Sequence, residues 1–331
     1  MRFVFKTSYD ADIRLFRDRT QAFWYLLLMV LAVCLPLLIS EYMIGEMTVV
    51  LIWAICAMGL MLLVGQSGQI SLGHAAFMAV GAYANVVYQT SFNLPFILSF
   101  PLSGLTAGLF GAILARPTSK LHGIYLAIAT LAISILAEDL IIMLEPVTGG
   151  ISGMFAPDIQ IFGYTFNRYG NAGELYWLIL FITVLIVLAY RNILRSPVGR
   201  AFAAIRDSEV SAKAMGVNVA KTKTIAFAIS CTITGLGGAL MGHFATVFTS
   251  ETFNIIMSIN LLMMIVIGGL GSIHGAFFGA IVFGLLPISI AFARDWIAGI
   301  TGAGSITVPG LETAIFGVIL IAFILLEPMG I

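Results

Sequence analysis

The stretch from Val64 to Phe77, VGQSGQISLGHAAF, places hydrogen-bonding side chains between two apolar runs of the chain. Amide, hydroxyl and imidazole groups can bind a polar solute or satisfy the backbone of an interrupted helix. The segment is either a buried break at membrane depth or a polar loop at the cytoplasmic surface, and the residues leave both interpretations open. If it is a break, the side chains that could line a path are Gln66, Ser67, Gln69, Ser71 and His74.

Two adjacent carboxylates, Glu138 and Asp139, lie about two thirds of the way along the apolar run from Ile124 to Leu144. An ionised carboxylate in a membrane span is costly and usually faces water, a partner or a transport path. Glu138 is therefore a further candidate for the path, where it could contact a substrate ammonium group. The alternative is that the span ends early and leaves both carboxylates near the outer surface.

Other chemistries have little support in the sequence. The three cysteines stand in apolar runs at no metal-like spacing, and the four histidines are scattered, so no metal site is expected. His74 and His274 are expected mainly as polar caps at helix starts. No Gly-Lys-Ser or Gly-Lys-Thr occurs, so the chain has no P-loop for ATP hydrolysis, and no nucleophile and base converge as in an enzyme. A net charge of zero gives no field for nucleic acid.

The elements that position these residues are transmembrane helices. The 331 residues are 60% hydrophobic and 10% charged, and the mean hydropathy is +1.06. This composition indicates an all-α polytopic membrane protein with one transmembrane domain over residues 1–331. About ten spans are predicted, approximately at 23–39, 47–64, 74–89, 96–115, 124–144, 175–190, 224–247, 255–268, 274–293 and 312–326.

The distribution of basic residues predicts the topology. With residues 1–21 in the cytoplasm, fourteen of the sixteen Lys and Arg residues fall on cytoplasmic segments, and Arg168 and Arg294 are the two exceptions. The apolar run from Ala22 to Ile39 has no cleavage pattern after it, so we interpret it as a retained span. Residues 191–223 form a second cytoplasmic segment, the predicted coupling loop. The chain ends at Ile331, directly after the last predicted span, which is compatible with a truncated C-terminus.

Within this segment, Ser196 to Gly216 is predicted to form one amphipathic helix of about 30 Å. Ser196 can cap it, Pro197 suits its first position, and Gly216 suits a left-handed stop. Such a helix lies either on anionic lipid or in a protein socket, and the mixed charge of "RDSE" favours the socket.

The sequence contains one short internal similarity. Gly68 and Gly268 each precede a histidine by six residues, and "HAAF" from His74 matches "HGAF" from His274 at an offset of 200. A parallel duplication would produce this pattern, and so would chance in a glycine-rich chain.

Four ordered motifs carry a resemblance to a known family. They are GQSGQISLGHAAFMAVGAYA from Gly65, TGGISGM from Thr148, SPVGRAFAAIRDSEVSAKAMGVNV from Ser196 and GGLGSIHGAFFGA from Gly268. Together they resemble the permease subunits of branched-chain amino acid ABC importers of the LivM type. The resemblance implies an ABC importer permease bundle that moves leucine, isoleucine and valine across the bacterial inner membrane. Related permeases for urea, amides or other amino acids are the alternative within the family, and an ion-coupled secondary transporter is the rival outside it.

The resemblance also implies partners and residue roles. The partners are a LivH-type permease, two ABC ATPases that use ATP and Mg²⁺, and a periplasmic binding protein, whereas this chain itself is expected to bind no cofactor. The external side toward the binding protein would include Thr148, Gly149, Gly150 and Ser152. ATPase coupling would involve Arg200, Phe202, Ile205, Arg206, Glu209, Ala212 and Gly216. Phe202 or Ile205 would dock into the ATPase. The coupling motif departs from the general pattern, because Glu209 lies one position early and no Leu-Pro follows.

Overall fold

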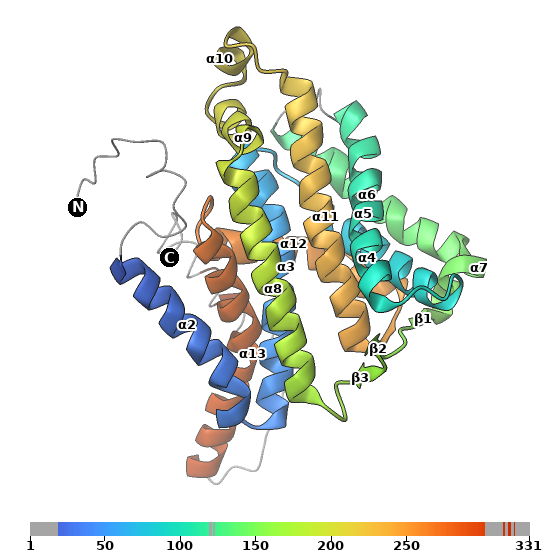
Figure 1. Cartoon of the computed structure of the whole chain (residues 1–331), viewed down its shortest axis with the longest axis vertical. Coiled ribbons are helices and arrows are strands. Elements are labelled where there is room, and N and C mark those ends of the chain that lie inside the picture. Colours follow the sequence, from blue (N-terminus) through green and yellow to red (C-terminus); the bar gives the residue numbers. More distant parts are fainter. Residues whose placement is uncertain are drawn as a thin grey trace.

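The fold of residues 19–118, 121 and 123–301, with isolated positions 314, 317, 318 and 321, is described by a computed structural model. The chain folds into a helical bundle with a few short strands (Figure 1). The elements in order are α2 (Arg19–Leu38), α3 (Glu41–Met61), the π-helical turn η1 (Leu62–Gln66), α4 (His74–Thr90), α5 (Phe96–Thr118), α6 (Ile124–Met143), α7 (Glu145–Thr148), η2 (Gly150–Ser152), β1 (Met154–Phe155), β2 (Ile159–Ile161), β3 (Tyr164–Phe166), α8 (Ala172–Arg195), α9 (Pro197–Asp207), α10 (Glu209–Ala214), α11 (Val219–Ala245), β4 (Val247–Phe248), η3 (Ser250–Phe253), α12 (Ile255–Ile267) and α13 (Ile273–Thr301).

The predicted spans agree with the helices. Within the described residues, 8 helical segments are long and apolar enough to cross a membrane by length and composition. Each of the first nine predicted spans coincides with a helix, including the 17-residue α4. Most of the tenth span, 312–326, and most of the N-terminal segment 1–21 lie outside the described residues. These helices confirm the predicted polytopic all-α fold. Helices suit a membrane because they satisfy their own backbone groups in lipid.

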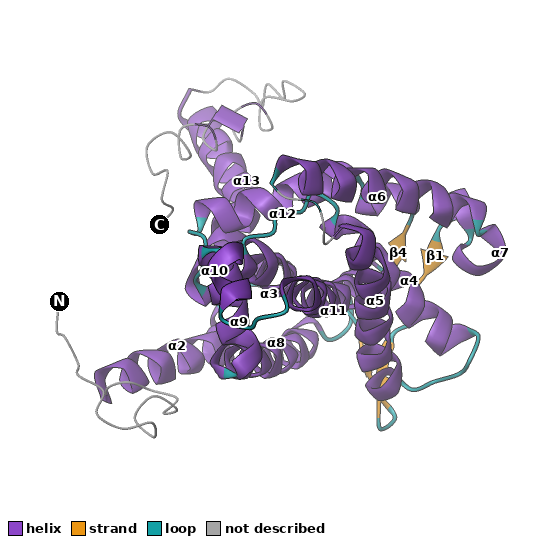
Figure 2. Ribbon diagram, turned by 90° about the horizontal axis from the view of Figure 1, so that it is seen from above, coloured by secondary structure: helices purple, strands orange, loops and turns teal. Residues whose placement is uncertain are grey.

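Helix α11 occupies the centre of the bundle, with α3, α4 and α5 packed around it (Figure 2). Glycines allow this close packing. A Cβ atom built on Gly81 of α4 would lie 2.0 Å from the carbonyl oxygen of Gly235, and one built on Gly238 would lie 2.1 Å from that of Met78. In lipid, where no hydrophobic force drives helices together, such backbone contact is a main source of helix association.

The bundle has two distinct ends, which are visible in Figure 1. Helices α9 and α10 lie at one end, which we call the α9–α10 end. The strands lie at the other, which we call the strand end. There β1 pairs antiparallel with β4, with Met154 opposite Phe248, and β2 pairs with β3, with Ile159 opposite Phe166. Because β1 precedes α8 and β4 follows α11, the first pair ties distant parts of the chain together at this end.

Candidate functional site

The stretch that carries the polar side chains begins as a distorted end of α3. The helix passes into the π-helical turn Leu62–Gln66, and the amide of Gln69 donates to the carbonyl of Leu63 at 3.1 Å instead of to that of Gly65. Gly68 then turns the chain with φ +70°, a conformation that favours glycine. The result is a break between α3 and α4, and π-helical turns of this kind are frequent at functional sites.

The break is buried in the protein. The side chains of Ser67, Gln69, Ser71 and His74 are buried, while Gly68 and Ile70 between them are exposed. The amide of Gln69 donates to the hydroxyl of Ser67 at 2.9 Å and to the carbonyl of Lys223 at 3.4 Å. The segment is therefore a break buried among other helices and not an exposed loop, while its depth in the membrane and its role in lining a path stay predictions.

His74 is the last polar residue of the break and is fully buried. Its Nε2 lies 2.7 Å from the hydroxyl of Ser230, and its Nδ1 lies 2.9 Å from that of Ser71. Ser230 uses its own hydrogen to donate to the carbonyl of Gly59, so it must accept from His74. The imidazole therefore carries a hydrogen on Nε2. Ser230 lies about 16 Å along α11 from the α9–α10 end, which places the start of α4 well inside the bundle.

The start of α4 is capped by residues other than His74. The amide of Ala75 donates to the hydroxyl of Ser258 in α12 at 2.9 Å, and the amide of Leu72 donates to that of Thr130 in α6 at 3.0 Å. His74 thus connects α4 to α11 and is not a backbone cap, contrary to our expectation. His274 likewise contacts the hydroxyl of Tyr25 in α2 through Nε2 and does not cap α13.

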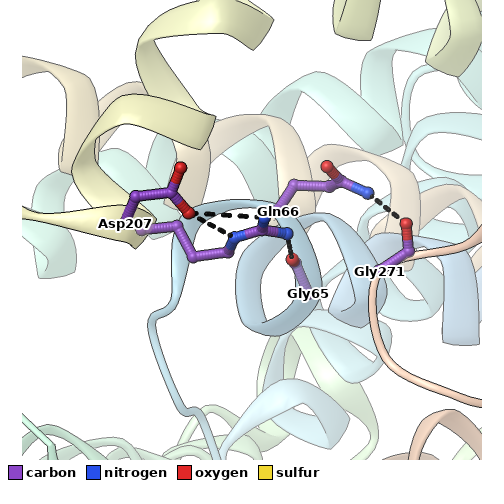
Figure 3. Close-up of polar contacts among 5 residues, drawn as sticks. Gly65, Gln66, Asp207 and Gly271 are labelled. Atoms are coloured by element: carbon purple, nitrogen blue, oxygen red, sulfur yellow. Dashed lines mark hydrogen bonds and ion pairs between the residues drawn. The ribbon is translucent and has the colours of Figure 1, made fainter.

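A second break lies beside the first (Figure 3). Between α12 and α13 the chain turns at Gly269 and Gly271, with φ +92° and +95°. The side-chain amide of Gln66 donates to the carbonyl of Gly271 at 2.7 Å. A Cβ atom built on Gly65 would lie 2.7 Å from the amide nitrogen of Gly271, so glycine is required for this approach. The two similar motifs of the sequence therefore meet in space at their glycines.

The segment from Ser196 to Gly216 contains two helices, α9 and α10, and not the single helix that we predicted. Ser208 adopts an extended conformation with φ −164° and caps α10, because its hydroxyl accepts from the amide of Ser211 at 3.2 Å. The predicted ends are correct. Ser196 caps α9 by accepting from the amide of Gly199, and Gly216 has φ +85°.

The apolar face of this segment points into the bundle. Phe202 is 0% exposed and Ile205 and Ala212 are 3% exposed. The expectation that Phe202 or Ile205 docks into an ATPase is therefore wrong, because a side chain packed inside its own chain has no surface to offer. Two large apolar side chains are exposed at α10: Val210 within it, at 81%, and Met215 directly after it, at 85%.

Charged residues join this segment to the bundle. Lys223 of α11, whose side chain is 4% exposed, forms an ion pair of 2.6 Å with Glu209 of α10. The guanidinium of Arg206 donates to the carbonyl of Gly65 at 2.9 Å and pairs with Asp207 at 3.4 Å. Arg200 donates to the carbonyl of Arg195 and stays at the surface. Of the predicted coupling residues, Arg206 and Glu209 thus contact the break or its neighbours, although the sequence had placed them only toward a partner.

Glu138 and Asp139 do not join the break. Thr130, which contacts Leu72, lies two turns before Glu138 on α6, or about 12 Å away along the helix. Glu138 is half-buried and Asp139 is exposed. Asp139 belongs to a stripe of exposed, mostly apolar residues on α6 at helical spacing: Tyr125, Ile128, Ala132, Ile135, Leu136, Asp139, Leu140 and Met143.

The predicted external residues lie together at the strand end. The hydroxyl of Thr148 bonds to the carbonyls of Ile141 and Leu144, and it accepts from the amide of Gly150. Gly149 and Gly150 have φ +71° and +57°, so the turn needs both glycines. Thr148 and Gly150 are buried and shape this turn, whereas Ser152 is exposed.

A polar cluster near the same end was missed by the sequence analysis. His243 of α11 contacts Asn85 and Gln89 of α4 through Nε2, at 2.8 and 3.0 Å, and the carbonyl of Pro157 through Nδ1 at 2.8 Å. The separations in sequence are too long for any spacing argument, and only the parallel packing of α4 on α11 brings these groups together. Among the residues that the structure describes, no group of three His, Cys, Asp or Glu could hold a metal ion.

Comparison with known proteins identifies relatives of this chain. Residues 42–324 match the family described as branched-chain amino acid transport system / permease component. The high-affinity branched-chain amino acid transport system permease protein LivM of Escherichia coli K12 is 31% identical over 297 residues, which cover 83% of this chain and 69% of the relative. No solved structure matches.

Two archaeal relatives extend the comparison. A probable branched-chain amino acid transport permease protein LivM of Methanocaldococcus jannaschii is 26% identical over 242 residues, covering 71% of this chain and 67% of the relative. A probable LivH permease of the same organism is 25% identical over 280 residues, covering 83% and 86%. Since the family match includes both breaks and the α9–α10 segment, the chain belongs to the permease components of branched-chain amino acid transport systems.

Proposed function

We propose that the chain is a transmembrane permease subunit of an ABC importer that translocates leucine, isoleucine and valine. The observation that carries this proposal is the family match over residues 42–324, and the LivM relatives support the substrate class. A branched-chain amino acid is zwitterionic with an apolar side chain. A path of amide, hydroxyl and small residues would suit it, with the tightest selection made by a separate binding protein.

The α9–α10 end is the proposed binding site for an ATPase, and the complex would contain two ATPases that use ATP and Mg²⁺. The sequence contains no P-loop, and separate ATPase subunits would supply the motor. Val210 and Met215 are the proposed contacts, because large exposed apolar side chains beside charged ones are typical of a protein interface. The ion pair of Glu209 with the buried Lys223 would keep α10 attached to α11 while the ATPases move this end of the chain.

A LivH-type permease is the proposed partner within the membrane. The exposed stripe of α6 supports this, because Asp139 on a lipid-facing surface would be costly, whereas a second subunit or water would accommodate it. LivM and LivH relatives both match this chain, which supports a pair of related permeases. Glu138, half-buried beside this stripe, is the carboxylate that we propose to contact a substrate ammonium group.

The strand end is the proposed outer face of a bacterial inner membrane, with the N-terminus in the cytoplasm. Lys213 and Lys221 lie at the opposite, α9–α10 end, as expected for a cytoplasmic surface. A periplasmic binding protein would dock at the strand end, on Ser152 and on apolar side chains exposed there, such as Ile151 and Phe155.

The experiment that tests the proposal starts from co-purification of the tagged chain from native membranes. Recovery of a related permease and two P-loop ATPases is expected, and the complex should then import leucine into liposomes when the binding protein and ATP are present. Import of urea or a short amide instead of leucine would change the substrate class. Recovery of the chain alone, transporting without ATP, would overturn the proposal in favour of a secondary transporter.

A further inference from the structure

The end of the first break leaves one backbone acceptor for a side chain to satisfy. In a continuous α-helix the carbonyl of Gly65 would accept from the amide of Gln69, but that amide donates to Leu63. The guanidinium of Arg206 donates to this carbonyl at 2.9 Å instead. A cation at the C-terminal end of a helix is also favoured by the helix dipole. The last turn of α9 therefore completes the end of α3.

The same arginine lies at the second break. A Cβ atom built on Gly271 would be 3.8 Å from Nη1 of Arg206, and one built on Gly68 would be 3.3 Å from its Cγ. Gly68 and Gly271 both have positive φ, so both are points at which the backbone turns without a side chain. The pair of Arg206 with Asp207 is exposed and contributes little by itself.

These contacts form one unit, which we call the Arg206 clamp: Arg206, Gly65, Gln66 and Gly271. Gln66 bonds the two breaks to each other, and Arg206 bonds one of them to α9 (Figure 3). A displacement of α9 cannot leave the breaks unchanged, because it would withdraw the donor from a carbonyl that has no other partner in the helix. Leaving a buried backbone acceptor unsatisfied is unfavourable.

We propose that Arg206 is a positioning residue that makes both breaks move together when α9 moves. It acts through the backbone and touches no substrate. The inference deepens the proposed function and rests on it, because it supposes that ATPases displace α9. It differs from a docking role at the ATPase surface, since the decisive contact of Arg206 is with the bundle.

The first test uses the complete complex in liposomes and compares leucine imported per ATP hydrolysed. Arg206→Ala is expected to lower this ratio by about tenfold, equivalent to about 1.4 kcal/mol, while ATP hydrolysis continues. Arg206→Lys, which keeps one charged donor, should be intermediate. The matched control is Asp207→Asn, which removes the neighbouring charge and leaves the clamp intact. An unchanged ratio in Arg206→Ala would overturn the inference, whereas a wild-type complex that does not import leucine would overturn the proposed function.

The second test observes the breaks directly and also covers an Arg206→Ala variant that fails to assemble. Spin labels are placed singly at Ile70→Cys and Leu270→Cys, which are exposed next to the two breaks, in a background with Cys34→Ser because the other two cysteines are buried. With wild-type Arg206, ATP should change the mobility of both labels. With Arg206→Lys, or with Arg206→Ala where it assembles, the two responses should separate. Identical responses with and without the substitution would show that the breaks do not depend on this arginine.

Discussion

The hydrogen bond between His74 and Ser230 gives the most direct test of how the break is held. Ser230→Ala removes the acceptor of the imidazole Nε2 at 2.7 Å, and both residues are fully buried. The lost hydrogen bond is worth about 1 kcal/mol, and the N–H left unpaired costs about 1–3 kcal/mol. The carbonyl of Gly59 also loses the hydroxyl of Ser230 as a donor. We therefore expect Ser230→Ala to lower the free energy of unfolding by about 2–3 kcal/mol.

The measurement is unfolding in mixed micelles with a denaturing detergent, followed by circular dichroism. A double-mutant cycle with His74→Phe isolates the pair, since the ring contacts of His74 with Phe77 and Phe227 show that an aromatic ring fits there. The coupling energy should be about 1–2 kcal/mol, near the upper end for polar contacts between membrane helices. Ser289→Ala, at an exposed hydroxyl of α13, serves as the control and should change stability by less than about 0.5 kcal/mol. If Ser230→Ala costs the same with phenylalanine at position 74, the bond does not hold the break.

Three further predictions concern other parts of the molecule. Gly81→Ala should lower the free energy of unfolding by about 1–3 kcal/mol, because its Cβ would meet a carbonyl of α11. Gly45→Ala, whose Cβ would meet nothing within 4 Å, should leave it unchanged. Equal effects of the two substitutions in the same detergent unfolding experiment would contradict this. Gly216→Val should reduce ATP-driven leucine uptake, because φ +85° strains a branched residue by about 1–2 kcal/mol. Gly216→Asn should retain more uptake than the valine variant. Normal uptake by the valine variant would refute this prediction. Val210→Glu should reduce co-purification of the ATPases, and Phe162→Glu at the strand end should not; the reverse pattern would refute the assigned interface.

The sequence predicted the spans well because hydrocarbon imposes a single requirement on each of them. A run of apolar residues must form a helix there, so each of the first nine predicted spans coincides with a helix of the structure, although some helices extend several residues further. The position of the break was also predictable, since glycines and amides in such a place need a special backbone. What remained open was its depth, because that depends on which helices surround it.

The contacts of the site were beyond sequence reasoning for a physical reason. In the sequence, three residues that hold the break look like small residues of ordinary spans: Ser230, Ser258 and Thr130. Their hydrogen-bond partners lie 58 to 183 residues away in the chain. The amphipathic pattern after Ser196 was correctly recognised, but the pattern does not say whether the apolar face turns toward the bundle or toward a partner. The split at Ser208 was also missed. A serine there can continue a helix or cap a new one, and tertiary packing decides between them.

The central position of α11 has a consequence for the order in which the protein is built. Its neighbours α3, α4 and α5 leave the ribosome first, and α11 is completed roughly 130 residues after α5. At the usual rate of translation this interval is roughly 6 to 25 s. During that time the earlier helices are in the membrane without the glycine-rich surface against which they pack. The newly inserted half must therefore be kept from associating wrongly, either by its insertion machinery or by weak contacts among its own helices, until α11 arrives and the bundle can close.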